Sequence, residues 1–297
     1  MVSVESTPAG GPQNKVSVIP NMVWSFWAQG TMNLPPVIQT CIDTWHQNGG
    51  VDSICVLDPI SVSEYLTRDE LPRTFSTLTP QMQSDAVRLA LLAKYGGIWL
   101  DASTVVTSAL MPWLDEVSRG EGFFLFQNPS GGRGGRLFEI GFMAVRSGHQ
   151  FFEAWSQEFN LFFSLKRVHL AHSPTSDAPW IAKKTFGVLN KWLRKTPRRS
   201  SLWARKPLSL LPFYPYFITY YLANNLLLAG GLGHHFGAMK HVDSLEYLRL
   251  RSRVNRGELD IGLQEARRSE IPVHDVEFRH PFTQRDLRKI RAVRDAV

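Results

Sequence analysis

The sequence predicts an α/β fold, with the strands of a sheet in its first half and mainly helices in its second. Apolar runs rich in β-branched and aromatic residues at 16–27 and 52–57 have the composition of buried strands. Between them, Pro35-Pro36 can open a helix, because proline fits the first helical position. Beyond Gly148 the apolar pattern turns mainly helical. Strands that alternate with helices and then give way to helices predict the α/β class.

The stretch from Thr79 to Asp101 is the most informative part of this pattern. Thr79 is a good N-cap and Pro80 fits the first helical position, so the two open a helix that runs to a pair of glycines. The apolar run 98–100 that follows the glycines is typical of a short strand. This strand ends at Asp101, so a carboxylate emerges at the carboxyl end of a strand.

Two more strands are expected in the first half and one near the end of the chain. The runs 122–126 and 138–145 have strand composition and are separated by a glycine-rich loop at 129–135. The segment 271–278 is again typical of extended structure, which predicts that the chain returns to the sheet.

Length and composition favour one domain. A chain of 297 residues with 43% hydrophobic residues can bury a large core, and we expect a single domain over residues 16–297. Residues 1–15 are rich in Ser, Pro and Gly and lack the profile of a signal peptide, so they are predicted to form a disordered arm.

The cysteines and the most apolar stretch indicate in which cellular compartment the chain is expected and whether it spans a membrane. Cys41 and Cys55 are too few for a disulfide framework and have no metal-ligand spacing, which favours a reducing, cytoplasmic location. The most apolar stretch, 208–232, is interrupted by Pro212 and Pro215, so it is not expected to span a membrane.

The formal net charge of +7 is concentrated between Lys183 and Lys206 and after Arg249. Anionic partners are therefore expected, and a diphosphate or an anionic membrane surface explains the charge equally well. Zinc-finger spacing, an RNA-binding aromatic signature and a recognition helix are absent from the sequence, so we expect no nucleic-acid partner. Ordinary solvated basic faces remain the alternative.

Three polar residues of the Thr79–Asp101 stretch are predicted to converge. Asp85 and Arg88 lie three apart and share a helical face. In open α/β sheets, ligands bind outside the carboxyl ends of the strands, which is where Asp101 is predicted to lie. The alternatives are an ordinary intrahelical ion pair for Asp85 and Arg88 and a turn-forming role for Asp101.

An ordered series of motifs resembles the capsular-polysaccharide-synthesis type of glycosyltransferase. That family is related to the yeast mannosyltransferases and to the large clostridial glucosylating toxins, which carry a DXD motif. The resemblance covers roughly residues 18–150. Its motifs are Ile19-Pro20, Val23 to Gly30, Pro35-Pro36, Trp45, Val56-Leu57-Asp58, the Ser84-Asp85-x-x-Arg88 helix and Tyr95 to Asp101.

The resemblance implies a GT-A-type, Rossmann-like sheet that binds a nucleotide-sugar. Residues 16–150 would form the donor-binding part and residues 151–297 a mainly helical acceptor side. The acidic motif would hold Mn²⁺ or Mg²⁺ against the diphosphate of a UDP- or GDP-linked sugar, since these cations prefer hard oxygen ligands. Transfer with retention of anomeric configuration is implied in the same way.

The resemblance also implies the roles of single residues. Asp101, Arg88 and Asp85 are expected to be catalytic, and Trp27 to stack on the nucleotide base with Trp24 as second choice. The expected donor contacts are Trp24, Trp27, Asp85, Arg88, Gly97, Trp99 and Asp101, and the expected metal ligands are Asp101, Ser103 and His274.

Ser103 departs from the family pattern because it stands where the second aspartate is usual. This exchange should weaken metal binding, and it is the main support for the alternative of a catalytically idle nucleotide-sugar-binding relative. The tryptophans have a core role as their alternative. Aromatic residues are frequent in the second half, which suits a small hydrophobic metabolite, a glycolipid or a glycan as acceptor, with possible peripheral membrane contact.

Overall fold

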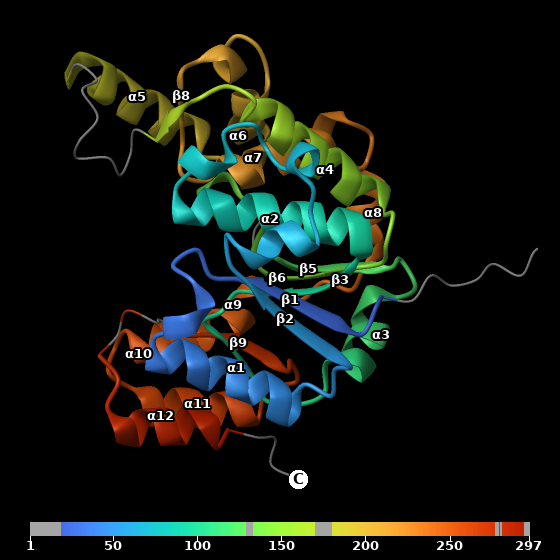
Figure 1. The fold of residues 1–297 in the computed structure, drawn as a ribbon. Coiled ribbons are helices and arrows are strands. Elements are labelled where there is room, and N and C mark those ends of the chain that lie inside the picture. Colours follow the sequence, from blue (N-terminus) through green and yellow to red (C-terminus); the bar gives the residue numbers. More distant parts are fainter. Residues whose placement is uncertain (1–18, 129–132, 170–179, 277–278, 280, 294–297) are drawn as a thin grey trace, which may run out of the picture.

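The computed structural model of the chain describes residues 19–128, 133–169, 180–276, 279 and 281–293 (Figure 1). The expected arm at 1–15 lies outside these residues, as does part of the expected glycine-rich loop at 129–135.

A five-stranded mixed sheet lies at the centre of the fold (Figure 1). Its strand order is β2-β1-β3-β6-β5; β1 pairs in parallel with β2 and β3, whereas β6 runs antiparallel to β3 and β5. The carboxyl ends of β1, β2 and β3 therefore share one edge with the amino end of β6. The strands are β1 (Met22–Phe26), β2 (Ser53–Leu57), β3 (Gly97–Leu100), β5 (Phe123–Gln127) and β6 (Phe138–Val145).

Helices cover both faces of this sheet. On one face α2 packs against β1, and α4 and α7 form a further layer outside α2 (Figure 1). On the other face lie α1 and the short β4–β9 pair. Every residue of β3 and β6 is buried, as expected for strands enclosed between two layers. The α/β class is thus confirmed. The helices named here are α1 (Pro36–Asn48), α2 (Pro80–Tyr95), α4 (Gln150–Phe162) and α7 (Ile218–Ala229).

The start of α2 and the turn into β3 form as the sequence predicts. Thr79 caps the helix by accepting a hydrogen bond from the Met82 amide at 3.4 Å. Gly96 ends the helix at φ +68°, and Gly97 follows at φ +95°. A Cβ on Gly97 would lie 2.7 Å from the carbonyl oxygen of Met22, so only glycine lets β3 start this close to β1.

The chain returns near its end, but to a different partner from the expected one. β9 (Val273–Asp275) pairs antiparallel with β4 (Thr104–Val106) in a separate two-stranded sheet and does not join the central sheet. β4 is held by α1, since the Trp45 indole donates to the Thr104 carbonyl at 2.6 Å. The short sheet thus fixes the end of the chain just beyond the carboxyl end of β3.

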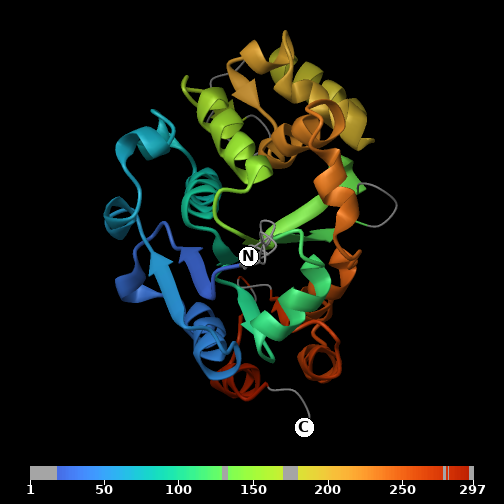
Figure 2. The same ribbon diagram turned by 90° about the vertical axis from the view of Figure 1, so that its right-hand side faces the viewer.

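The second half is mainly helical, as predicted, and its elements surround the central layers (Figure 2). In the apolar stretch 208–232 the structure has the short strand β8, helix α7 and turns. Among the described residues, no helix combines the length and apolar character needed to cross a membrane. The remaining helices are α3 (Leu110–Ser118), α5 (Trp180–Leu193), α6 (Pro197–Ser200), α8 (Gly233–Ala238), α9 (Ser244–Tyr247), α10 (Arg249–Val254), α11 (Leu259–Arg267) and α12 (Gln284–Arg291). A third, two-stranded sheet pairs β7 (Val168–His169) with β8 (Phe213–Tyr214).

Candidate active site

Asp101 lies directly after β3, at the edge where the parallel strands end. Its amide donates to the Gly141 carbonyl of β6 at 2.8 Å, which fixes the backbone. Its Oδ1 accepts hydrogen bonds from Arg88 Nη2 at 3.0 Å and from the Trp99 indole at 2.9 Å. The side chain is 37% exposed, and in the part of the chain that the structure describes Oδ2 has no hydrogen-bond partner. One carboxylate oxygen is therefore held and the other is presented to solvent.

Gly141 of β6 lets the backbone pass close to this free oxygen. A Cβ at Gly141 would lie 3.1 Å from Asp101 Oδ2 and 2.6 Å from the Tyr247 hydroxyl. Any larger residue at this position would therefore press on the Asp101 carboxylate and on Tyr247.

Arg88 is buried beside Asp101 and is held from several sides. Its Nη1 donates to the Ile140 carbonyl at 2.6 Å and its Nη2 to Ser84 Oγ at 3.2 Å. The guanidinium also lies 4.9 Å from the centre of the Trp99 ring, a cation–π distance. The positive charge is thus fixed in one position next to Asp101.

Asp85 supports this arginine from the buried side. Its Oδ1 lies 3.3 Å from Arg88 Nη2, and its Oδ2 accepts from Thr219 Oγ1 of α7 at 2.5 Å. Burial raises the pKa of Asp85, an effect that the charge of Arg88 opposes. The predicted convergence of Asp85, Arg88 and Asp101 is present. Because both oxygens of Asp85 are engaged inside the protein, its geometry is that of a residue that positions Arg88.

Three predicted donor contacts are placed away from the surface. Trp99 is fully buried and uses its indole to hold Asp101. Trp24 is also buried, and its indole donates to the Gly96 carbonyl at 2.9 Å between the rings of Tyr65 and Tyr95. Gly97 lies at the amino end of β3, opposite the edge of Asp101. We therefore correct the expectation of donor contact for these three residues. The rings of Trp24 and Trp99 belong to the hydrophobic core, and Gly97 lies at the opposite edge of the sheet.

Trp27 differs from the other tryptophans. It follows β1, its amide donates to the Leu57 carbonyl at 2.8 Å, and its side chain is only partly buried. The parallel register Trp24↔Trp99 places it at the same edge as Asp101. Its role in stacking on a base stays a prediction.

Asp58, at the carboxyl end of β2, holds the loops beside Trp27 together. Its two oxygens accept hydrogen bonds from the amides of Thr31, Ile60 and Ser61 and from the hydroxyls of Thr31 and Ser61. These bonds, that of the Ser61 amide above all, hold the pKa of Asp58 well below its usual range, although its burial opposes them.

We expect Asp58→Ala to lower the free energy of unfolding by about 2–3 kcal/mol at pH 7, because several donors lose a charged acceptor. The lowered pKa means that this stabilisation is present above the unfolded value of about 4 and is lost as the pH falls through the folded value. Urea denaturation across that range measures both effects. The exposed Asp52→Ala is the control, and equal midpoints for the two variants would contradict the expectation.

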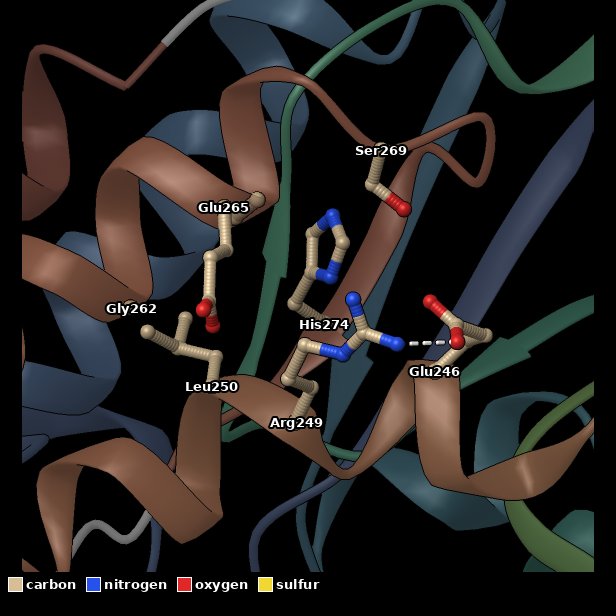
Figure 3. A pocket seen from close by; sticks show the side chains of 8 residues that line it. Glu246, Arg249, Leu250, Gly262, Glu265, Ser269 and His274 are labelled. Carbon is tan, nitrogen blue, oxygen red and sulfur yellow. Dashed lines mark hydrogen bonds and ion pairs between the residues drawn. The ribbon is translucent and has the colours of Figure 1, made fainter.

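Ser103 meets Asp275 and not the predicted His274. Ser103 Oγ donates to Asp275 Oδ1 at 3.0 Å, whereas His274 lies next to Asp275 on β9 and points to the other side of the strand. Figure 3 shows the His274 ring between α10 and α11, near Glu265 and Ser269. Burial lowers the pKa of His274 to about 4. Side-chain alternation along an extended strand therefore separates His274 from Asp101 and Ser103.

Asp275 is the residue that sequence reasoning missed. It is buried, and its Oδ2 accepts from Arg251 Nη1 of α10 at 3.0 Å. Burial raises its pKa to about 7, the Arg251 charge opposes that rise, and the nearby Asp101 adds to it. The available signal was its place beside His274 in a predicted strand, since only one of two neighbours can face Ser103.

A second missed group surrounds Glu139 at the amino end of β6. Its Oε2 accepts from Arg136 Nη1 at 2.8 Å and from the Tyr220 hydroxyl of α7 at 3.3 Å. Burial raises the pKa of Glu139, and Arg136 opposes that rise. Because β6 runs antiparallel to β3, this group lies at the same edge of the sheet as Asp101.

The donor atoms at this edge suit a cation that is shared with phosphate. Among the described residues, no group of three His, Cys, Asp or Glu side chains is arranged to hold a metal by itself. Ser103 nevertheless contacts Asp275, and Asp101 lies near enough to Asp275 for its charge to raise the pKa of that residue. Mg²⁺ is commonly held by one or two carboxylates together with substrate phosphates, so this set fits such an ion.

Comparison with known proteins identifies two relatives that each match about half of the chain. The chain is 32% identical over 156 residues to the O-glycosyltransferase braB of Annulohypoxylon truncatum, and 30% identical over 181 residues to the glycosyltransferase afumC of Aspergillus fumigatus. These alignments cover 46% and 53% of this chain but only 36% and 46% of the relatives. The chain thus matches less than half the length of either relative.

A solved structure and a family model complete the comparison. The PaToxG glycosyltransferase aligns over 93% of this chain and 88% of its own at 13% identity, but the TM-score of 0.38 is too low to show a common fold. The model of the capsular polysaccharide synthesis protein family matches residues 7–172, more than half of the chain. The chain therefore belongs to the capsular polysaccharide synthesis protein family.

Proposed function

We propose that the chain transfers a sugar from a UDP- or GDP-linked donor to a hydroxyl group of a small hydrophobic metabolite, a glycolipid or a glycan. The observation that carries this proposal is Asp101 at the end of β3, with one oxygen held by Arg88 and Trp99 and the other free. Family membership and the names of the two relatives support it. The central sheet, with its polar edge, suits a GT-A-type arrangement.

The proposed transfer is assisted by Mn²⁺ or Mg²⁺, which would be held by the free oxygen of Asp101 and by Ser103 and Asp275, whose mutual hydrogen bond would open to admit the ion. When bound, the cation neutralises the donor diphosphate and so favours its departure. Asp275 takes the place that the sequence assigned to His274, because Asp275 is the residue in contact with Ser103. It also supplies the second carboxylate, which weakens the case for a catalytically idle relative.

The other residues at the edge have roles in binding and orientation. Arg88, whose guanidinium is fixed next to Asp101, is proposed to stabilise the negative charge that develops on the leaving diphosphate, because preorganised charge lowers the barrier. Trp27 is proposed to stack on the base. The bond from the sugar to the diphosphate oxygen breaks, a bond to the acceptor oxygen forms, and the proton of the acceptor hydroxyl passes to the departing phosphate oxygen. Retention, with the acceptor on the face of the leaving group, is proposed from the family resemblance.

A panel of nucleotide-sugars tests the proposal, with release of free nucleoside diphosphate as the readout in Mn²⁺, Mg²⁺ or chelator. Slow hydrolysis of one donor without acceptor, lost with chelator, is the expected result. Calorimetry with each donor separates the alternatives. Binding without release would favour an idle relative, and absence of both binding and release would overturn the proposal.

We expect Asp275→Asn to raise the Mn²⁺ concentration for half-maximal activity by about 10–100-fold, because a carboxylate that faces the ion is lost. His274→Gln should leave this concentration within about twofold of wild type, since its side chain points away from Ser103. A titration of activity against Mn²⁺ measures both. The reverse order of the two effects would reinstate His274 as the ligand.

The compartment is part of the proposal. Cys41 and Cys55 are both free thiols, which agrees with a reducing environment such as the cytoplasm.

A further inference from the structure

Positive charge and exposed apolar side chains gather in the same part of the chain. Between Glu158 and Asp243 the sequence has a single acidic residue, Asp177, among many lysines and arginines. Most of the large hydrophobic residues that the described structure leaves exposed fall in this segment. They are Leu161, Leu165, Val168, Val188, Trp192, Leu210, Tyr216 and Leu228. Exposed apolar side chains that gather in one region mark a surface that contacts a partner, and the lysines and arginines around them favour an anionic one.

Helix α5 carries this combination on one face. Lys184, Val188, Lys191 and Trp192 recur at helical spacing on α5, and Lys195 follows the end of the helix; all five are exposed. Val188 is 67% exposed and Trp192 46%. The opposite face of the helix packs inward through Phe186, Leu189 and Leu193. The outward face therefore mixes aliphatic, aromatic and cationic side chains and has no acidic residue.

The residues after α5 extend the basic surface around Trp192. Arg194, Lys195 and Arg198 are exposed, and the Arg199 guanidinium lies 4.7 Å from the centre of the Trp192 ring. A tryptophan among cationic side chains is the pattern found at membrane–water interfaces, where the ring lies at the level of the headgroups.

Neighbouring segments add aliphatic side chains beside α5. The Phe186 ring of α5 packs edge-on against Phe213 of β8, and Phe213 pairs with Val168 of β7. Val168 is exposed on β7, and Leu210 is exposed in the short helix Leu208–Leu210 that precedes β8. In both ribbon views α5 lies at the end of the molecule opposite α11 and α12 (Figures 1 and 2). The outward face of α5 is thus at an extremity of the fold.

We propose that the α5 surface, defined as the exposed residues of 184–199 with Val168 and Leu210, docks the protein on an anionic lipid membrane. The lysines and arginines attract acidic headgroups, each adding about fivefold to the affinity. Val188, Trp192 and Leu210 enter the headgroup region, where burial of their apolar area adds to binding. The surface is distinct from the edge that carries Asp101, so the inference does not depend on the proposed transfer reaction.

A nucleic acid explains the same charges less well. Phosphate backbones attract lysine and arginine, and bases stack on tryptophan. Exposed aliphatic side chains such as Val188, Leu165 and Leu210 have no partner in that kind of complex. The apolar part of a bilayer does offer these aliphatic side chains a partner, so the observations favour a membrane.

Sedimentation of the full chain with vesicles tests the inference, with phosphatidylcholine alone or mixed with phosphatidylserine. The wild type should bind the mixed vesicles more tightly, and added salt should weaken that preference. Lys191→Ala with Lys195→Ala should reduce binding to the mixed vesicles by about fivefold for each lysine and leave binding to the neutral vesicles unchanged. Val188→Ser with Trp192→Ser should reduce binding to both kinds by about tenfold.

A charge-matched control lies on α12. Arg285→Ala with Arg288→Ala removes two exposed positive charges from a helix whose apolar residues Leu287 and Ile290 are buried, so it should change vesicle binding by less than about twofold. Equal losses in the two double variants would show that net charge, and not the α5 surface, causes binding. Failure of the wild type to bind mixed vesicles, or a preference for oligonucleotides over them, would overturn the inference.

Discussion

Asp101→Asn is expected to reduce nucleoside-diphosphate release by about a thousandfold at saturating donor and Mn²⁺. The variant loses the charge that would face the cation and the diphosphate, which is worth several kcal/mol in the transition state. It keeps an oxygen at Oδ1 that can still accept from Arg88 and Trp99, so the fold around it should persist. Initial rates of product release measure the loss.

The matched control for this variant is Asp115→Asn, which neutralises an exposed aspartate on α3 and should keep full activity. Thermal unfolding of both variants should match that of the wild type within a few degrees. If Asp101→Asn kept more than a tenth of the wild-type rate, the reaction would have to take place at another part of the molecule.

Arg88→Met is expected to lower the free energy of unfolding by about 3–5 kcal/mol, because it leaves the buried Asp85 carboxylate without its counter-charge. For a domain of this size the melting temperature should fall by roughly 10 °C. Asp85→Asn introduced into the same variant should recover part of the loss, since the unpaired charge is then gone. Thermal and urea unfolding of the two single variants and the double variant measure the coupling.

Arg68→Met is the control for the second prediction, because Arg68 is exposed and should contribute less than about 0.5 kcal/mol. Strictly additive effects of Arg88→Met and Asp85→Asn would mean that the two side chains do not interact energetically, despite their 3.3 Å separation.

Short-range sequence signals predicted much of the structure of residues 16–150, the expected donor-binding part. The Thr79 cap, the Pro80 start and the glycines after Tyr95 define α2 by backbone chemistry that acts within a few residues. The strand that follows ends where the sequence places Asp101. Asp85 and Arg88 then meet Asp101 because helix geometry and strand direction leave few other arrangements.

Contacts between distant parts of the chain could not be predicted from such signals. The pairing of Ser103 with Asp275 depends on which of two neighbours on β9 faces β4, and that register is set by packing. Glu139 joins the site because β6 runs antiparallel, a direction that its composition does not encode. Trp24 and Trp99 were misassigned because an aromatic ring has the same sequence signature in a core and in a base-stacking site.

The distances along the chain between residues that meet at the site have a consequence for folding. Ser103 and Asp275 are 172 residues apart, and Asp85 and Thr219 are 134 apart. Such contacts close large loops, whose entropic cost is repaid only after the elements between them are ordered. We therefore expect the edge that carries Asp101 to form last during folding. On refolding from urea, activity should then return later than the secondary structure of the five-stranded sheet.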